Sequence, residues 1–142
     1  MKVCGVEIKG NDAVICIMSK QMGLYDIPKT RVAKISVGDA GDPEEMRKFQ
    51  FTFAKFLEDY QVEKVVIKGR ALKGKFSGGA IGFKLEAAIQ LIADLDVEIL
   101  ASALIKKTME RSQVAIDFRD TGLKTYQQVA FETVFTSFER RD

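Results

Sequence analysis

Residues 3–18 read Val3-Cys4-Gly5-Val6-Glu7-Ile8-Lys9-Gly10-Asn11-Asp12-Ala13-Val14-Ile15-Cys16-Ile17-Met18. Two apolar runs, 3–8 and 13–18, are typical of buried strands, and the polar segment between them contains Gly10 and Asn11, which tolerate the positive φ of a tight turn. The pattern therefore predicts an antiparallel hairpin. A third strand is predicted over residues 31–37, where charged and apolar residues alternate, and residues 19–30 are predicted to be irregular.

After this meander, the pattern indicates alternating helices and strands. Asp42 can cap a helix that has Pro43 at its first position, and apolar side chains follow at helical spacing: Met46, Phe49, Phe53, Phe56, Leu57 and Tyr60. Short strands are predicted over 63–68 and 97–100, and helices over 80–95, 102–111 and 124–138. The sequence thus predicts an α/β fold with a mixed five-stranded sheet, its first three strands an antiparallel meander, and helices on both faces. All 142 residues are expected to form one domain.

The composition excludes several classes of function. The 142 residues are 46% hydrophobic and 30% charged, with 22 basic residues, 20 acidic residues and no histidine. Without histidine, one chain cannot form a Ser-His-Asp triad, a Cys-His pair or a His-ligated zinc site. No apolar run approaches the roughly 18 residues of a membrane span, and the start does not resemble a signal peptide, so we expect no membrane association and a cytoplasmic location.

The two cysteines, Cys4 and Cys16, lie in the two apolar strands of the predicted hairpin. They lack the spacing of a zinc or redox motif, so we interpret them as buried free thiols. A Cys4–Cys16 disulfide across the hairpin is the alternative, and it would suit an oxidising compartment.

The order of elements resembles the ribonuclease H-like fold, and in particular its bacterial Holliday-junction resolvase branch. Residues 3–10 are similar to the first strand of that branch, with Glu7 at the position of its first acid. Residues 65–68 are similar to its fourth strand, with Lys68 at the position of its second acid. Residues 84–89 resemble the following helix, and Ile105-Lys106-Lys107-Thr108 matches a hydrophobic-Lys-x-Thr run after the fifth strand. The chain also resembles a small bacterial family of unknown function within this fold.

This resemblance implies a site that has lost part of its chemistry. Nucleases of this fold hold two divalent metal ions with three or four carboxylates, of which the last helix supplies two. The corresponding helix here offers only Glu132, and Lys68 places a positive charge where a carboxylate is expected. We therefore expect a degenerate site of Glu7, Lys68 and Glu132 that holds no metal. The plainer alternatives are an exposed or structurally paired Glu7 and a solvated Lys68.

A basic, glycine-rich segment follows the fourth predicted strand. It contains Lys68, Arg70, Lys73 and Lys75, interleaved with glycines and Phe76. Exposed backbone amides and basic side chains favour phosphate, so this segment is predicted to contact nucleic acid or another anion. Lys9 and Lys106 are expected to extend the same surface. A solvated loop without a ligand is the alternative.

The sequence is therefore consistent with three functions. The first is a non-catalytic nucleic-acid or phosphate-binding domain in which Glu7 pairs with Lys68. The second is a Mg²⁺- or Mn²⁺-dependent nuclease in which Glu7 and Glu132 hold the metal ions with help from Glu86 or Asp117. The third is a homodimeric interaction domain, for which the sequence offers an aromatic surface of Phe51, Phe76 or Phe131.

Overall fold

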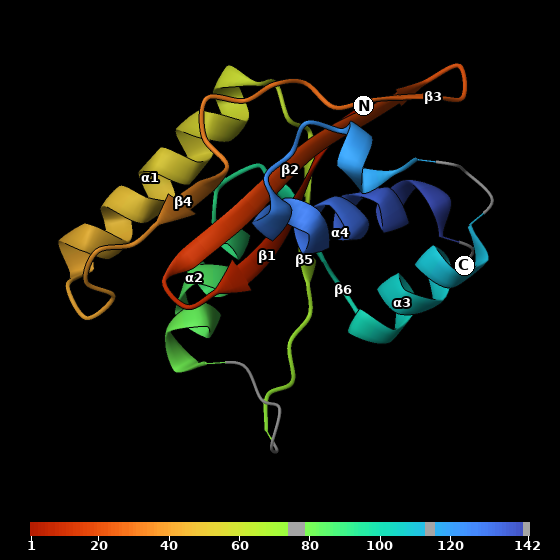
Figure 1. The fold of residues 1–142 in the computed structure, drawn as a ribbon. Helices are drawn as coiled ribbons and strands as arrows, with labels where there is room; N and C mark the ends of the chain where they lie inside the picture. Colours follow the sequence, from red (N-terminus) through yellow and green to blue (C-terminus); the bar gives the residue numbers. More distant parts are fainter. Residues whose placement is uncertain (74–78, 113–115, 141–142) are drawn as a thin grey trace.

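Figure 1 shows the computed structural model, which describes residues 1–73, 79–112 and 116–140. Its strands are β1 (Lys2–Lys9), β2 (Asp12–Gln21), β3 (Leu24–Asp26), β4 (Lys34–Ser36), β5 (Lys64–Lys68) and β6 (Asp96–Leu100). Its helices are α1 (Pro43–Asp59), α2 (Ala80–Gln90), α3 (Ser102–Arg111) and α4 (Gln128–Glu139), with short 3-10 helices η1 (Phe118–Asp120) and η2 (Thr125–Gln127).

The sheet has the mixed topology that the sequence predicts. Strands run in the order β3-β2-β1-β5-β6, and β4 also pairs with β2. β1, β2 and β4 form the antiparallel meander, whereas β5 and β6 extend the sheet parallel to β1. A parallel neighbour requires a crossover, and α1 and α2 provide the two crossovers. The predicted α/β class is confirmed.

The sheet contains one strand more than the sequence predicts. Residues 19–30 are not irregular throughout, because β2 continues to Gln21 and turns back into β3. The turn consists of Met22 and Gly23, which both have positive φ, at 53° and 81°. Two such residues form the turn whose twist matches that of the adjoining strands. Because methionine is an unusual residue for this conformation, the sequence does not indicate a turn at Met22.

The two faces of the sheet bury different helices (Figure 1). α1 and α2 pack on one face, where Phe49, Phe53 and Phe56 are at most 2% exposed. Each such ring stabilises the fold by roughly 2–3 kcal/mol. α4 and α3 pack on the other face, where Phe131 and Phe135 are buried. Helices therefore cover both faces, as predicted.

The helix boundaries differ from the prediction in detail. Asp42 caps α1 by accepting a hydrogen bond from the Glu44 backbone N–H at 3.0 Å. α2 ends at Gln90 rather than at residue 95, because the chain must turn there, with Asp94 at positive φ, to enter β6. Ala101, not Ser102, occupies the N-cap of α3, so no side chain caps that helix.

Cys4 and Cys16 are free and buried, as predicted. They lie on adjacent strands but on opposite faces of the sheet, since Cys4 packs with α1 and α2 and Cys16 packs with α4. The alternative disulfide is therefore wrong. Burial raises the pKa of the Cys16 thiol to about 12, so neither thiol is disposed to react. Among the described residues, no helix combines the length and apolar character needed to cross a membrane.

Candidate functional site

One row of side chains crosses the sheet at the carboxyl ends of the parallel strands. Glu7 of β1 lies opposite Val14 of β2, and Val14 lies opposite Lys34 of β4. On the other side, Lys68 follows Ile67, the β5 partner of Val6, so it lies beside Glu7. Side chains in one register point to one face, and Val14 packs in the cluster beneath α4. Lys34, Glu7 and Lys68 therefore face α4 together, at the sheet edge where α/β proteins commonly bind ligands.

α4 lies unusually close to this row. Gly5, two residues before Glu7 on the same face, would place a Cβ 2.4 Å from the Ala130 carbonyl oxygen and 2.7 Å from the Val134 Cβ. Only a glycine permits this approach. The contact brings Glu132 of α4, whose carboxylate accepts a bond from Gln128 at 3.4 Å, into the surroundings of Glu7.

The electrostatics of Glu7 identify its charged neighbours. Burial raises the pKa of the Glu7 carboxyl above its ordinary value, Lys68 and Lys9 lower the pKa, and Glu132 raises it further. Three further predicted site residues, Lys68, Lys9 and Glu132, thus act electrostatically on Glu7. The direct Glu7–Lys68 ion pair expected from the sequence is not formed, because their charged atoms lie more than 4.0 Å apart. Their attraction acts at longer range.

Lys34 brings a further cation to the row. Its ammonium lies 3.6 Å from the Asp12 carboxylate and 5.5 Å from the centre of the Tyr126 ring, on η2. The ring is 40% exposed, so an aromatic surface accompanies the basic groups at this edge.

Arg70 packs against the helix that follows its segment. Its guanidinium lies against α2, 4.4 Å from the Phe83 ring centre, and Nε and Nη2 are buried without hydrogen-bond partners. The absent side chain of Gly82 makes the space, since a Cβ there would lie 2.4 Å from the guanidinium nitrogens. The nearby Glu86 carboxyl is also buried, which raises its pKa, while Arg70 lowers it. Arg70 thus anchors its segment to α2, and its predicted contact with phosphate stays a prediction.

The remaining described basic candidates lie on exposed segments beyond the row. Lys73 is exposed on the segment after β5, and Lys106 is exposed on α3, but neither is among the charges that shift the pKa of Glu7. Lys75 lies outside the described residues, as does Phe76. Of the aromatic surface, Phe51 is 72% exposed, but Phe131 is buried and packs against Phe118 and Phe135, so it is not part of such a surface.

The acids expected to assist a metal site lie elsewhere. Glu86 is buried beside Arg70, and Asp117 is held by Arg119 in a 2.8 Å ion pair. Neither contributes to the electrostatics of Glu7. In the described part of the chain, no three His, Cys, Asp or Glu side chains lie close enough to hold a metal ion. The residues around Glu7 fit a divalent cation poorly, because Lys68 and Lys9 bring positive charge to a pair of carboxylates.

RuvC and a viral Holliday junction resolvase are among the solved structures that are similar to this chain. The chain is similar to RuvC from Thermus thermophilus, with a TM-score of 0.72 and 12% identity over 96% of this chain and 92% of that chain. It is similar to T. thermophilus RuvC in complex with a Holliday junction substrate, with a TM-score of 0.73, 10% identity, and coverage of 98% and 93%. A fowlpox virus Holliday junction resolvase matches with a TM-score of 0.51, 13% identity, and coverage of 98% and 99%. These likenesses confirm the predicted ribonuclease H-like, resolvase-like fold.

The sequence also matches a family, over residues 1–137, that is described as "Protein of unknown function (DUF3010)". The chain belongs to the DUF3010 family. No curated protein is significantly similar to it in sequence. Membership of DUF3010 confirms the predicted relation to a family of unknown function and adds no activity, so the chemistry must be argued from the site.

The sequence does not predict the part of this DUF3010 site that Lys34 and Tyr126 form. Lys34 and Tyr126 stand on elements far apart in the sequence, and Lys34 was expected only as part of a strand. The alternation of residues 31–37 predicts which of them share a face, but the register against β2 places Lys34 in the row of Glu7. No local pattern carries that register.

Proposed function

We propose that this protein binds nucleic acid through phosphate contacts at the carboxyl edge of its sheet, and that its resolvase-like acidic centre is degenerate. The observation that carries the proposal is the position of Lys68. It stands beside Glu7, on the face covered by α4, where a two-metal site would need a second carboxylate. An ammonium group there attracts a phosphate and repels a divalent cation.

The surroundings support phosphate rather than metal as the ligand. Lys9 and Lys68 act on Glu7 from β1 and β5, and Lys73 is exposed just beyond β5. The RuvC structure with a Holliday junction substrate supports nucleic acid as the source of the phosphate, since that protein shares the fold. In this account Glu7 holds the lysines in place by long-range attraction.

Fluorescence anisotropy with labelled DNA tests the proposal. The probes are four-way junction, duplex and single-stranded DNA and RNA, each titrated over a salt series without divalent metal. We expect binding to duplex DNA that weakens steeply with salt. Replacing Lys68→Gln plus Lys73→Gln should lower the slope of log K against log salt by about 1.8, since each phosphate contact contributes about 0.9.

The matched control is Arg47→Gln plus Lys55→Gln, which removes the same charge from α1. Both control residues are exposed and pair with acids of their own helix. Absence of binding by the unmodified protein at low salt would refute the proposal. Equal losses in the control and the test variant would refute the assignment of the two lysines.

A Mg²⁺- or Mn²⁺-dependent nuclease is the second candidate, and the nearness of Glu132 to Glu7 favours it. The same substrates incubated with either metal ion test this alternative. Our proposal expects no cleavage. Metal-dependent cleavage that disappears in Glu7→Gln would establish the nuclease instead.

A homodimer remains a third prediction, favoured by exposed apolar groups on the outer helices. Phe51 of α1 is 72% exposed, and Leu91, after α2, is 77% exposed and lines a groove between the two helices. Sedimentation analysis should show a dimer that Phe51→Glu plus Leu91→Glu converts to monomer. A monomer at all concentrations would contradict this prediction.

A further inference from the structure

A second groove lies beyond Lys34, between the segment after β3 and the segment before α4. Residues 27–33 and 121–124 line it together with Gln127, around a volume of about 440 Å³. Its lining contains three cations, Lys29, Arg31 and Lys124, and no acidic residue. A cavity with walls of one charge concentrates ligands of the opposite charge.

Two of these cations are available to a ligand. Arg31 is already engaged, because its guanidinium lies 3.0 Å from the Asp59 carboxylate and 5.5 Å from the Tyr60 ring centre. Among the described residues, the ammonium groups of Lys29 and Lys124 have neither a hydrogen bond nor an ion pair. Both ammonium groups can therefore bind an anion without first breaking an ion pair.

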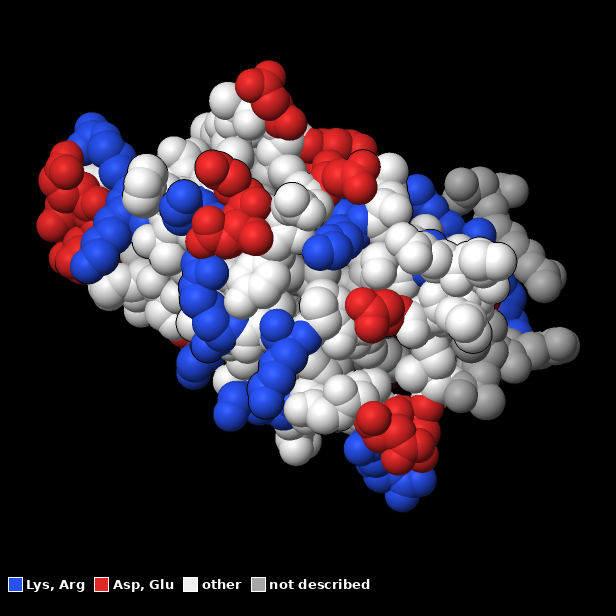
Figure 2. Space-filling view, turned by 90° about the horizontal axis from the view of Figure 1, so that it is seen from above, with Lys and Arg blue, Asp and Glu red and all other residues white. Residues whose placement is uncertain are grey.

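The charge of the groove is locally distinct. The neighbouring pocket shares Ile27 and Thr121 with it, but is lined by Asp117 and Asp120 and by no lysine or arginine. Figure 2 shows several basic side chains gathered on one part of the upper face, with acidic and basic side chains intermingled elsewhere on it. An anion is thus directed to one groove and away from the other.

The groove continues the row of Glu7. Ala33 and Gln127 border it, and the residues beside them, Lys34 and Tyr126, make the cation–ring contact described above. Lys34 stands two strands from Glu7, roughly 10 Å at the spacing of strands in a sheet. A nucleic-acid strand bound at Lys68 could therefore extend across the sheet, past Lys34, into the groove.

We propose that this groove binds the phosphate backbone of a single-stranded nucleic acid segment, with Lys29 and Lys124 as phosphate contacts and Tyr126 as a stacking surface for a base. The inference rests on the proposed function and extends it to the opposite side of Glu7. Basic grooves with an exposed aromatic ring are typical of single-strand binding. The volume is in the range of pockets for small ligands, so it suits individual nucleotides of a strand.

The test measures the affinity for labelled single-stranded oligothymidylate by fluorescence anisotropy at several salt concentrations. Lys29→Gln plus Lys124→Gln should weaken binding about ten-fold at low salt and lower the salt slope by about 1.4, at about 0.7 for each phosphate contact. Tyr126→Ala should weaken binding with the slope unchanged. The control, Arg47→Gln plus Lys55→Gln, has the same net charge as the double variant and should change affinity less than about two-fold.

The outcomes separate this inference from the proposed function. If Lys68→Gln plus Lys73→Gln weakens binding while the groove variant matches the control, the groove inference is overturned and the proposed function stands. If the unmodified protein binds no oligonucleotide, both are overturned. Inorganic phosphate is the competing probe: displacement of the strand by phosphate at concentrations similar to those of strand phosphate would show a site for free phosphate and overturn the assignment to a strand.

Discussion

Glu7 carries its charge at a cost to the folded protein. The side chain is half-buried on β1, and burial raises its pKa above the ordinary 4.5 despite Lys68 and Lys9. A group whose pKa is raised on folding destabilises the fold above that pKa, where it is ionised, and ceases to do so as the pH falls toward its unfolded value. Residues kept at such a cost commonly have a functional role.

Replacing Glu7→Gln should therefore stabilise the protein at neutral pH. We expect the free energy of unfolding at pH 7 to rise by roughly 1 kcal/mol, the cost of an unsatisfied, partly buried polar group. The gain should shrink as the pH falls through the raised pKa of Glu7 and should be absent below about 4.5, where Glu7 is mainly protonated in both the folded and the unfolded protein. Urea unfolding at several pH values measures the effect. A destabilised variant at pH 7 would show that Glu7 is a structural ion-pair partner.

Gly82 and Arg70 form a second residue-scale test. Gly82→Ala should gain about 1 kcal/mol of helix propensity but displace the guanidinium from Phe83, a loss of about 1 kcal/mol. In a protein that carries Arg70→Ala, Gly82→Ala has no guanidinium to displace, so only the gain in helix propensity remains. A double-mutant cycle in urea should therefore show a nearly neutral single variant and a stabilising one in the Arg70→Ala background. Equal effects in both backgrounds would contradict the packing of Arg70 on α2.

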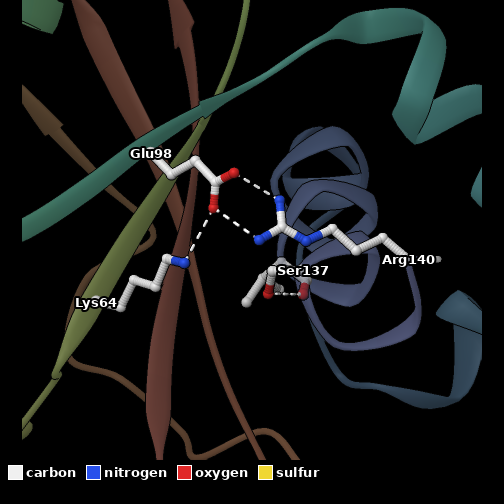
Figure 3. Close-up of polar contacts among 5 residues, drawn as sticks. Lys64, Glu98, Ser137 and Arg140 are labelled. Carbon is white, nitrogen blue, oxygen red and sulfur yellow. Dashed lines mark hydrogen bonds and ion pairs between the residues drawn. The ribbon is translucent and has the colours of Figure 1, made fainter. Parts of the chain in front are cut away.

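At the scale of elements, one carboxylate joins two strands to a helix. Glu98 of β6 accepts hydrogen bonds from Arg140 after α4, at 2.6 and 2.9 Å, and from Lys64 of β5, at 2.9 Å (Figure 3). The bonds from Arg140, followed by those from Lys64, lower the pKa of Glu98 to about 2. Lys64 is the first residue of β5 and Arg140 directly follows α4, so the cluster ties the C-terminal end of α4 to β5 and β6.

This cluster predicts a loss of stability in acid. Because the pKa of Glu98 is lowered from 4.5 to about 2, its contribution is present above pH 4.5 and is lost as the pH falls toward 2. The side chain is 34% exposed, so solvent screening limits the loss to roughly 1 kcal/mol. Glu98→Gln should be less stable at pH 7 and should lack this segment of the pH profile. An unchanged profile would assign the acid transition to other groups.

Some helices and strands can be predicted from neighbouring residues alone, and others cannot. The capped start of α1 and the hairpin of β1 and β2 follow from neighbouring residues, and both were predicted within a few residues. The strand β3 is not predicted, because its three residues form too short a pattern. It is held instead by contacts of Tyr25 with Glu139 and Phe135 of α4. Such contacts join parts of the chain that no local pattern connects.

For the whole molecule, the prediction of one domain over residues 1–142 has a direct test. Both cores share the central strand β1, so losing either should expose the other. Urea unfolding followed by far-ultraviolet circular dichroism and by tyrosine fluorescence should give coincident transitions. Separate midpoints would show that the two layers fold independently.

The sequence by itself determined the α/β class, the hairpin of β1 and β2 and the capped start of α1, and its resemblance to the resolvases aligned Lys68 with an acid of that branch. These features depend on periodicity, caps and single positions, which short-range interactions set. Only the tertiary structure decided that Arg70 packs onto α2, that Glu132 acts electrostatically on Glu7, and that Lys34 joins the same row. Those placements depend on strand register and on the close approach of α4 at Gly5, which arise when distant segments pack against each other.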